Sequence, residues 1–349
     1  MAYTTIDNPF KHFNTVLYTG ANQSITGVNF QPDWVWIKER DSGYHAIFDS
    51  IRGATKILSS NVTNAESTQS DTLTAFGTDG FTLGADSSNY VGGSSTSTVS
   101  WNWLAGGTAS SNTNGSITST VSANTTAGFS IVKWTGNNIA GATVGHGLGA
   151  VPKMIIFRNY SITENWTVYH HSLTSNNYKL DLDGNGAEAA VANPYLENTT
   201  PTSTLITLGD HQRVNGSGNS IIAYCFAEIK GYSKFGKYIS NNTANDGPFI
   251  YTGFKPAIVL TKISSTGGAN WRIFDNKREI YNGDRQYLQP NTTDGESNQD
   301  PSQMDLLSNG FKLRGAEGDS NYNTETVIYW AFAEAPFVTS GTKAAGTAV

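Results

Sequence analysis

"IIAYCFAEIK" (residues 221–230) has a close counterpart in "VIYWAFAEAP" (327–336), and both stretches carry apolar and aromatic residues that lead into Phe-Ala-Glu. Local structure does not require such agreement, so the pair indicates an internal repeat. Earlier in the chain, "TVSWNWLAGG" (98–107) has the same character, with "WLAGG" in place of the Phe-Ala-Glu ending. The repeat therefore predicts three copies of one unit, each closed by this strand-like stretch.

Four further segments precede the closing stretch in the same order in each copy. The opening segments read "FNTVLYTG" (13–20), "FSIVKWTG" (129–136) and "FGKYISNN" (235–242). The second segments read "FQPDWVWIKER" (30–40), "AVPKMIIFRNY" (150–160) and "FKPAIVLTKIS" (254–264). The third segments are 45–52, 165–172 and 270–278, and the fourth are 80–86, 205–211 and 310–316. This alignment predicts that Phe13, Phe129 and Phe235 are equivalent.

Each segment has the residue pattern of a β-strand. In "WVWIK" the side chains of Trp34 and Trp36 fall on one face and those of Val35 and Ile37 on the other. The closing strands put large rings on one face and mostly small residues on the other, which would admit a neighbouring sheet, from the same module or from another copy. Many strands separated by turn signals favour an all-β fold of three tandem β-sandwich modules of roughly a hundred residues. The pattern leaves jelly-roll and lectin-like topologies open.

Composition shifts suggest the domain boundaries. We expect an N-terminal arm at 1–12, module 1 at 13–104, a Ser/Thr/Asn/Gly-rich linker at 105–128, module 2 at 129–230, module 3 at 231–335 and a C-terminal tail at 336–349. The low-complexity linker predicts a loosely tethered module 1, whereas modules 2 and 3 follow each other directly and should be rigidly stacked. The arm and the tail are expected to be free to dock elsewhere.

The composition limits the classes of partner and compartment. Charged residues make up 14% of the chain and the formal net charge is −6, which gives no attraction to nucleic acid or to an anionic membrane surface. The single cysteine, Cys225, excludes an intrachain disulfide. The opening residues lack a secretory-signal pattern and no apolar run is long enough to span a bilayer, so we expect synthesis in a cytosol and no membrane insertion.

"DLDGNG" (181–186) resembles part of a calcium loop. Asp181, Asp183 and Asn185 alternate as hard oxygen ligands would. The twelfth position is Ala192 instead of Glu, and no flanking helices are predicted. The alternative is a polar hairpin turn, and we predict no cofactor.

Other polar residues offer little catalytic chemistry. His146, His170, His171 and His211 could supply zinc ligands, but the repeat places Asp49 and Asp275 where module 2 has His170. We therefore expect surface histidines instead of a metal site.

Carboxylates have structural interpretations as well. Asp49 with Arg52, and Asp275 with Arg278, have the spacing of a turn fixed by an ion pair, and the alternative is a ligand-binding acid. Glu228 and Glu334 end strands of different modules, so they do not form a predicted acid–base couple. We predict that the protein is not an enzyme.

Aromatic residues leave one functional ambiguity. Tryptophans at strand positions recur with the repeat, so we expect them in the core. Tyrosines in loops are better placed to contact a glycan or a neighbouring subunit, and the candidates are Tyr90, Tyr160, Tyr195 and Tyr322.

Several phrases of the sequence resemble repeat-containing virion structural proteins of marine tailed phages, such as cyanophages and pelagiphages. The matching phrases are "MAYTTID", "FQPDWVWIK", "IRGATK", "DGFTLG", "WNWLAGG", "VGHGLGAVPK", "NGSGN", "YCFAE", "GYSKFG", "YTGFKP", "LSNGFKLR" and "AFAEAPF". The resemblance implies a tail fibre, appendage or decoration protein that is synthesised in a host bacterial cytoplasm and located in the virion, with head, neck or tail proteins as partners. We expect a homo-oligomer, a trimer in the first instance. The alternative is a carbohydrate-binding protein that recognises the host surface.

Overall fold

Strand β3 (Trp34–Glu39) is buried along its whole length, and its two faces have different surroundings. Val35 and Ile37 pack in a core cluster confined to module 1, whereas Trp34 and Trp36 belong to a larger cluster with residues from all three modules. Because side chains alternate along a strand, one face of this sheet lies inside its own module and the other lies against modules 2 and 3.

The computed structural model describes residues 3–93, 95–244, 246–279, 281–282, 286–297, 304–316 and 318–339. Within them the chain is nearly all-β with antiparallel sheets, which confirms the all-β part of the predicted fold class. We keep the names module 1, module 2 and module 3 for residues 13–104, 129–230 and 231–335. No helix among the described residues is long and apolar enough to cross a bilayer.

Module 1 pairs a four-stranded sheet with a smaller one. The large sheet has the order β1 (Phe13–Thr19), β9 (Ser97–Trp103), β3, β4 (His45–Asp49). The small sheet has the order β2 (Ser24–Ile25), β8 (Gly80–Leu83), β7 (Leu73–Gly77), and β5 (Lys56–Ile57) pairs separately with β6 (Ser67–Thr68). Apolar residues of the small sheet share a core cluster with Val35 and Ile37, so the two sheets pack face to face.

Module 2 contains the corresponding strand order β12 (Phe129–Thr135), β19 (Ser220–Ala227), β14 (Pro152–Asn159), β15 (Thr167–His170). Its sheet extends to eight strands through β10 (Ser110–Asn112) and β11 (Ser119–Asn124) at one edge, and β16 (Tyr178–Asp181) and β17 (Ala189–Ala190) at the other. A second sheet pairs β13 (Ala142–Gly145) with β18 (Leu205–Leu208), and a short helix, α1, covers Gln212–Asn215.

Residues 105–128, predicted to be a Ser/Thr/Asn/Gly-rich linker between modules 1 and 2, contain two strands of the module 2 sheet, so this prediction is wrong. β11 pairs with β12 from Thr120↔Lys133 to Asn124↔Phe129, and β10 pairs with β11. Val121 is buried in the core cluster of module 2. The Ser- and Thr-rich composition does not distinguish a linker from a strand, because hydroxyl residues also suit an edge strand with one face in water.

Module 3 has the large sheet β20 (Ser233–Ile239), β26 (Thr326–Pro336), β22 (Phe254–Ile263), β23 (Arg272–Asp275). Its small sheet has the order β21 (Phe249–Tyr251), β25 (Gly310–Leu313), β24 (Met304–Leu307).

The expected equivalence of Phe235 with Phe13 and Phe129 is wrong by two residues. Trp103, Phe226 and Phe332 hold the same place in the closing strands β9, β19 and β26. Phe13 is opposite Trp103 and Phe129 is opposite Phe226, but the residue opposite Phe332 is Ser233 and not Phe235. A slip of two residues keeps the same faces of a strand, so the alternating pattern could not detect it.

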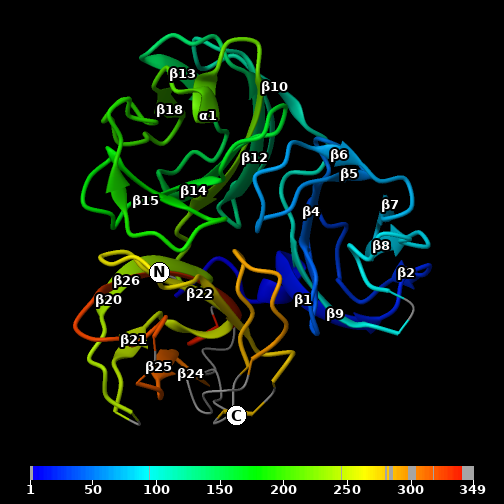
Figure 1. Ribbon diagram of the computed structural model, residues 1–349, viewed down its shortest axis with the longest axis vertical. Helices are drawn as coiled ribbons and strands as arrows, with labels where there is room; N and C mark the ends of the chain where they lie inside the picture. Colours follow the sequence, from blue (N-terminus) through cyan, green and yellow to red (C-terminus); the bar gives the residue numbers. More distant parts are fainter. Residues whose placement is uncertain are drawn as a thin grey trace.

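The three modules form three lobes around a common centre (Figure 1). At this centre Trp34 of module 1 stacks on Tyr224 of module 2, with ring centroids 4.7 Å apart. Trp330 of module 3 lies 5.5 Å from Trp103 of module 1 and 5.0 Å from Phe226 of module 2. Module 1 is therefore packed against both other modules, and the expectation that it is loosely tethered is wrong.

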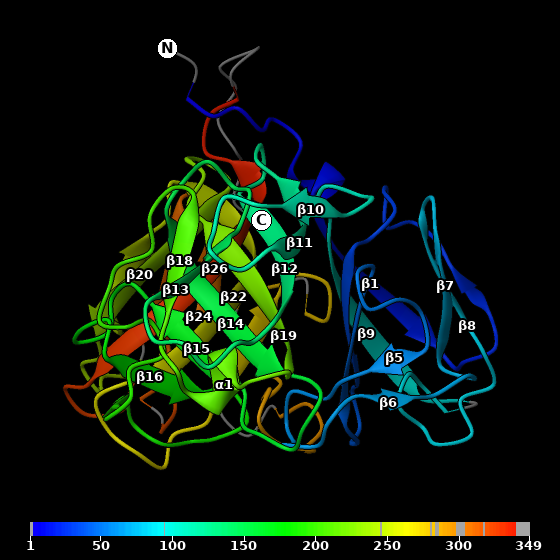
Figure 2. The same cartoon turned by 90° about the horizontal axis from the view of Figure 1, so that it is seen from above.

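The start of the chain is also packed. Thr4 and Ile6 are buried, and Ile6 belongs to the shared core cluster. The Tyr3 hydroxyl donates to the Gly253 carbonyl of module 3 at 2.6 Å, and a short 3-10 helix, η1, covers Pro9–Lys11. Figure 2 shows this segment in blue beside the red end of the described chain. The arm is not free from Tyr3 onward, while the predicted tail lies outside the described residues beyond Thr339.

Candidate functional site

The junctions between modules hold a hydrogen bond of the same kind at the same place in the strand register. Trp166 Nε1 of module 2 donates to the Ser59 carbonyl of module 1 at 2.8 Å, and Trp271 Nε1 of module 3 donates to the Asp181 carbonyl of module 2 at 2.9 Å. In module 1 a histidine takes the place of the tryptophan, and His45 Nε2 lies 2.9 Å from the Gln289 carbonyl of module 3. The three contacts run from module 2 to 1, from 3 to 2 and from 1 to 3, which closes a ring.

The tautomer of His45 follows from its other neighbour. Trp36 Nε1 donates to His45 Nδ1 at 2.9 Å, so Nδ1 is an acceptor and Nε2 carries the proton that the Gln289 carbonyl accepts. Burial holds the pKa of His45 well below its ordinary value. The neutral ring thus acts as a fixed donor and acceptor at the junction.

In a second layer of three contacts, two run in the same direction as the first layer. The Tyr224 hydroxyl of module 2 donates to Asp49 Oδ2 of module 1 at 2.8 Å, and Trp101 Nε1 of module 1 donates to Asp275 Oδ2 of module 3 at 3.1 Å. The residue at the matching place in module 2 is His170. Its Nδ1 accepts from the Ser172 amide, so Nε2 carries the proton and donates to the Tyr329 carbonyl of module 3 at 3.2 Å, which reverses the direction of the contact. The strand register confirms that His170 occupies the place of the two aspartates.

Asp49 and Asp275 each fix a turn as well as a junction. Asp49 Oδ1 accepts from the Arg52 amide at 2.8 Å, and Asp275 Oδ1 accepts from the Arg278 amide at 2.9 Å. Each arginine also pairs with its aspartate through Nε, and all four side chains are almost fully buried. Burial would raise the pKa of Asp275, but the charge of Arg278 and its hydrogen bonds lower it overall. The predicted turn is confirmed, and the use of the carboxylates by a neighbouring module was not foreseen.

Three buried cations occupy another matched position on the second strand. Lys38, Arg158 and Lys262 are each fully buried, and each donates to backbone carbonyls. Burial lowers the pKa of both lysines to about 8 and that of Arg158 to about 10. Arg158 differs in reaching across the junction, where Nη2 donates to the Thr63 carbonyl at 2.7 Å and also to that of Asn64.

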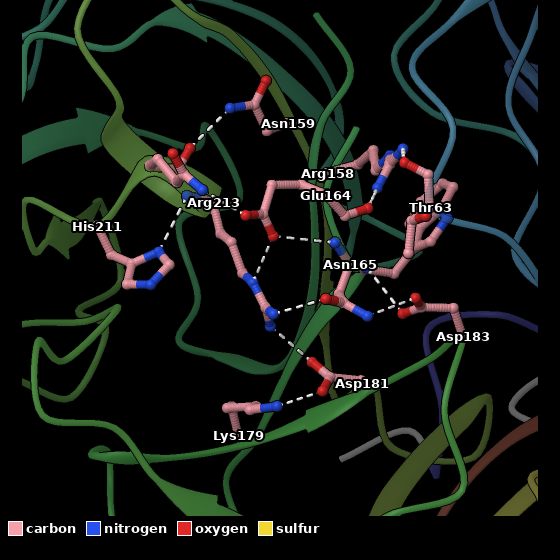
Figure 3. Close-up of polar contacts among 12 residues, drawn as sticks. Thr63, Arg158, Asn159, Glu164, Asn165, Lys179, Asp181, Asp183, His211 and Arg213 are labelled. Carbon is pink, nitrogen blue, oxygen red and sulfur yellow. Dashed lines mark hydrogen bonds and ion pairs between the residues drawn. The ribbon is translucent and has the colours of Figure 1, made fainter. Parts of the chain in front are cut away.

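Around Arg158 lies the polar network drawn in Figure 3, which joins the loops of module 2 to module 1. Arg213 donates to Glu164 at 2.7 Å, to Asp181 at 2.8 Å and to Asn165 at 2.6 Å. Burial would raise the pKa of Glu164, but hydrogen bonds and the Arg213 charge lower it overall. The Glu164 amide donates to the Thr63 carbonyl of module 1 at 2.9 Å, so the network fixes the loop at 61–66.

The network also accounts for the predicted calcium residues. One oxygen of Asp181 accepts from Arg213 and the other pairs with Lys179. Asp183 accepts from Asn165 Nδ2 at 2.7 Å and from the Trp166 amide at 2.9 Å, and burial raises its pKa. The Asn185 carbonyl accepts from the Gly268 amide of module 3. These oxygens face protein donors, and the part of the chain that the structure describes contains no cluster of three His, Cys, Asp or Glu placed to hold a metal ion.

We expected the histidines to lie on the surface, but this prediction is wrong for two of them. His146 and His170 are buried, and His146 Nε2 lies 3.2 Å from the Thr202 carbonyl. His211 caps α1 by accepting from the Arg213 amide. Burial lowers the pKa of His170 to about 3. Each buried ring satisfies backbone groups in a loop or at a junction, a role that sequence pattern does not distinguish from surface exposure.

The four candidate tyrosines have separate environments. Tyr195 is 5% exposed and packs edge-on against His211 at 4.7 Å, so it does not present a surface for contact. Tyr160 is half-buried beside Ser220, while Tyr322 is 45% exposed. Tyr90 lines a surface groove with Tyr44, which the sequence reasoning missed. A comparison of the three modules would have found Tyr44, because modules 2 and 3 have an asparagine, Asn165 or Asn270, at the corresponding position.

This groove has a volume of about 160 Å³ and lies on module 1. Its lining residues are Tyr44, Ile57, Leu58, Ser59, Val62, Asn64, Ala65, Ser67 and Tyr90. The rings of Tyr44 and Tyr90 are 5.9 Å apart and inclined at 39°. One wall is the segment that module 2 holds through Trp166, Arg158 and a bond from the Glu66 amide to the Tyr160 carbonyl. The groove is thus shaped by the closure of the modules on one another.

The remaining acidic candidates lie in separate ion pairs. Glu228 pairs with Lys234 at 2.9 Å, and Glu334 pairs with Lys255 at 3.1 Å. Ala227 is opposite Pro152 and Ala333 is opposite Pro256, so the next residues, Glu228 just after β19 and Glu334 inside β26, hold corresponding positions. Neither arrangement brings two carboxylates to one cleft.

Residues 8–336 match the model of a family described as a domain of unknown function, DUF7483. The match spans most of the chain, so the protein belongs to this family. Comparisons with curated proteins and with solved structures find no match.

Proposed function

We propose that this member of the DUF7483 family is a non-enzymatic structural protein of a tailed-phage virion, a fibre, appendage or decoration protein made of three copies of one β-sandwich module. The observation that carries the proposal is the junction bond that occurs three times in one direction, at His45, Trp166 and Trp271. Copies of one fold that contact each other head to tail form a ring when the rotation between successive copies closes, and an open filament when it does not. The chain would then be a trimer-like body in a single polypeptide.

A rigid body of this kind suits a structural role. The buried charged groups at the junctions are engaged in ion pairs or in hydrogen bonds to backbone carbonyls, as Arg52 with Asp49 and Lys38 with the Ser42 carbonyl. They serve to fix turns and junctions, which favours assembly over catalysis. The virion assignment itself is supported by the resemblance of the sequence phrases to marine phage structural proteins.

Association of copies is part of the proposal, with a homotrimer as the expected form and other virion proteins as partners. Ala223 and Cys225, on the small-residue face of β19, pack in the core cluster of module 2 itself. Copies would therefore associate through other surfaces. Sedimentation of the purified chain tests this expectation, and a stable monomer at micromolar concentration would count against it.

Mass spectrometry of gradient-purified phage particles tests the virion assignment. We expect this chain at a fixed ratio to the major capsid protein, and immunogold labelling would then place it on head, neck or tail. Absence from particles whose other structural proteins are detected would refute the assignment.

A second candidate function is recognition of a carbohydrate on the host surface. It is favoured by one observation, the groove in which Tyr44 and Tyr90 lie side by side. A screen of the purified protein on a glycan array tests it.

A further inference from the structure

We infer that the groove between Tyr44 and Tyr90 binds a single ring of a neutral sugar, an inference that rests on the recognition function proposed above. Tyr44 is 43% exposed, and its ring lies 5.9 Å from that of Tyr90. Tyrosine combines an apolar ring with a polar hydroxyl. A pyranose has the matching character, with C–H groups on its faces and hydroxyls around its rim.

The lining of the groove selects against charged ligands. None of its nine residues is acidic or basic. A carboxylate, sulfate or ammonium group would lose water there without gaining an ionic partner, which is costly. Ser59, Asn64 and Ser67 offer hydroxyl, amide and backbone groups that can both donate to and accept from sugar hydroxyls. The absence of an acid or base among these lining residues also favours binding over cleavage.

The size of the groove limits the ligand. About 160 Å³ is below the roughly 300–1,000 Å³ of sites that enclose drug-sized ligands. One ring can enter while the rest of a chain of sugars extends into solvent. A terminal or branching residue of a surface polysaccharide fits this description.

Tyr44 differs in its surroundings from the residues at the corresponding positions of modules 2 and 3. The corresponding residues of modules 2 and 3, Asn165 and Asn270, are used inside the protein. Asn165 donates to Asp183, and the Asn270 side-chain oxygen accepts from Asn291 at 2.7 Å. Tyr44 instead places an aromatic ring at the surface, beside the half-buried ring of Tyr90.

The wall opposite solvent is fixed before any ligand arrives. Arg158 donates to the Thr63 and Asn64 carbonyls directly behind the groove residues Val62, Asn64 and Ala65. A preformed wall reduces the entropy lost on binding.

The test uses the full-length protein on an array of neutral oligosaccharides together with sialylated and sulfated ones. The strongest neutral ligand is then titrated by calorimetry into the wild type and the Tyr44→Asn variant, which carries the residue found in modules 2 and 3. We expect affinity to fall about tenfold or more, because one stacking surface is lost. Tyr281→Ala removes a tyrosine that is 65% exposed and lies outside the groove, and it should leave the affinity unchanged; thermal melts of both variants check folding.

The outcomes separate the site from the function. Binding of neutral glycans that Tyr44→Asn abolishes supports the inference. Binding that Tyr44→Asn leaves intact overturns the site but keeps the recognition function, and a preference for sialylated or sulfated glycans overturns the neutral-ligand assignment. If the wild type binds no glycan, both the site and the recognition function are wrong.

Discussion

Replacing Tyr224 with Phe should weaken the junction between modules 1 and 2 with little change in shape. The Tyr224 hydroxyl donates to Asp49 Oδ2 at 2.8 Å, and both side chains are fully buried. The phenylalanine ring can keep the stack on Trp34, whose centroid lies 4.7 Å away. The change therefore isolates one hydrogen bond to a charged acceptor.

The expected loss follows from what remains around Asp49. A hydrogen bond to a charged group contributes about 1.5–3 kcal/mol. Asp49 keeps Arg52 and two backbone amides as donors, so we expect the lower part of this range, about 1.5–2 kcal/mol. Tyr18→Phe is the control, because the Tyr18 hydroxyl donates to the neutral Val91 carbonyl within module 1; it should cost about 1 kcal/mol.

Urea unfolding followed by tryptophan fluorescence measures both losses. The midpoint should fall with an unchanged slope, which signals a change in stability alone. Combining Tyr224→Phe with Asp49→Asn gives a coupling energy, expected to exceed about 0.5 kcal/mol for groups in contact. A loss below about 0.5 kcal/mol, or strict additivity of the two changes, would refute the role assigned to this bond.

The other perturbations address the core, the acid response and the arm. Trp330→Ala and Trp101→Ala should each cost roughly 3–5 kcal/mol, whereas Tyr90→Ala should change the melting temperature little; a mild effect at Trp330 would mean that its face is not part of a core. Because the folded pKa of His170 is about 3 against an ordinary 6.5, the unfolded chain binds this proton more readily. The stability from neutral His170 is present above about pH 6.5 and is lost as the pH falls toward 3. His170→Gln should therefore lose less stability than the wild type between pH 7 and pH 4, and equal losses in urea titrations would contradict this assignment. Deleting residues 1–12 removes the buried Ile6 and should lower the melting temperature of the purified protein; an unchanged melt would mean that the arm is dispensable for folding.

The sequence was most informative about which residues form strands and which of them share a face. The alternation of Trp34 and Trp36 with Val35 and Ile37 assigned these residues correctly to the two faces of β3. It did not say what covers each face, because periodicity describes a strand and not its partner. The meeting of Trp34, Tyr224 and Trp330 at one centre depends on long-range packing of modules.

The candidate site was less predictable. Tyr90 was chosen for its loop position, but Tyr195, chosen for the same reason, is buried against His211. A polar loop sequence does not reveal whether its aromatic ring turns inward. Arg158 looked like one more strand residue, although it supports the groove through carbonyls of another module.

Differential scanning calorimetry of the intact chain tests most directly whether the three modules form one closed body. Modules that share the core around Trp34, Tyr224 and Trp330 should unfold together, in a single transition whose calorimetric and van't Hoff enthalpies agree. Independent modules would give separate transitions, or a calorimetric enthalpy about three times the van't Hoff value. The first result is the one that the ring predicts, and the second would contradict it.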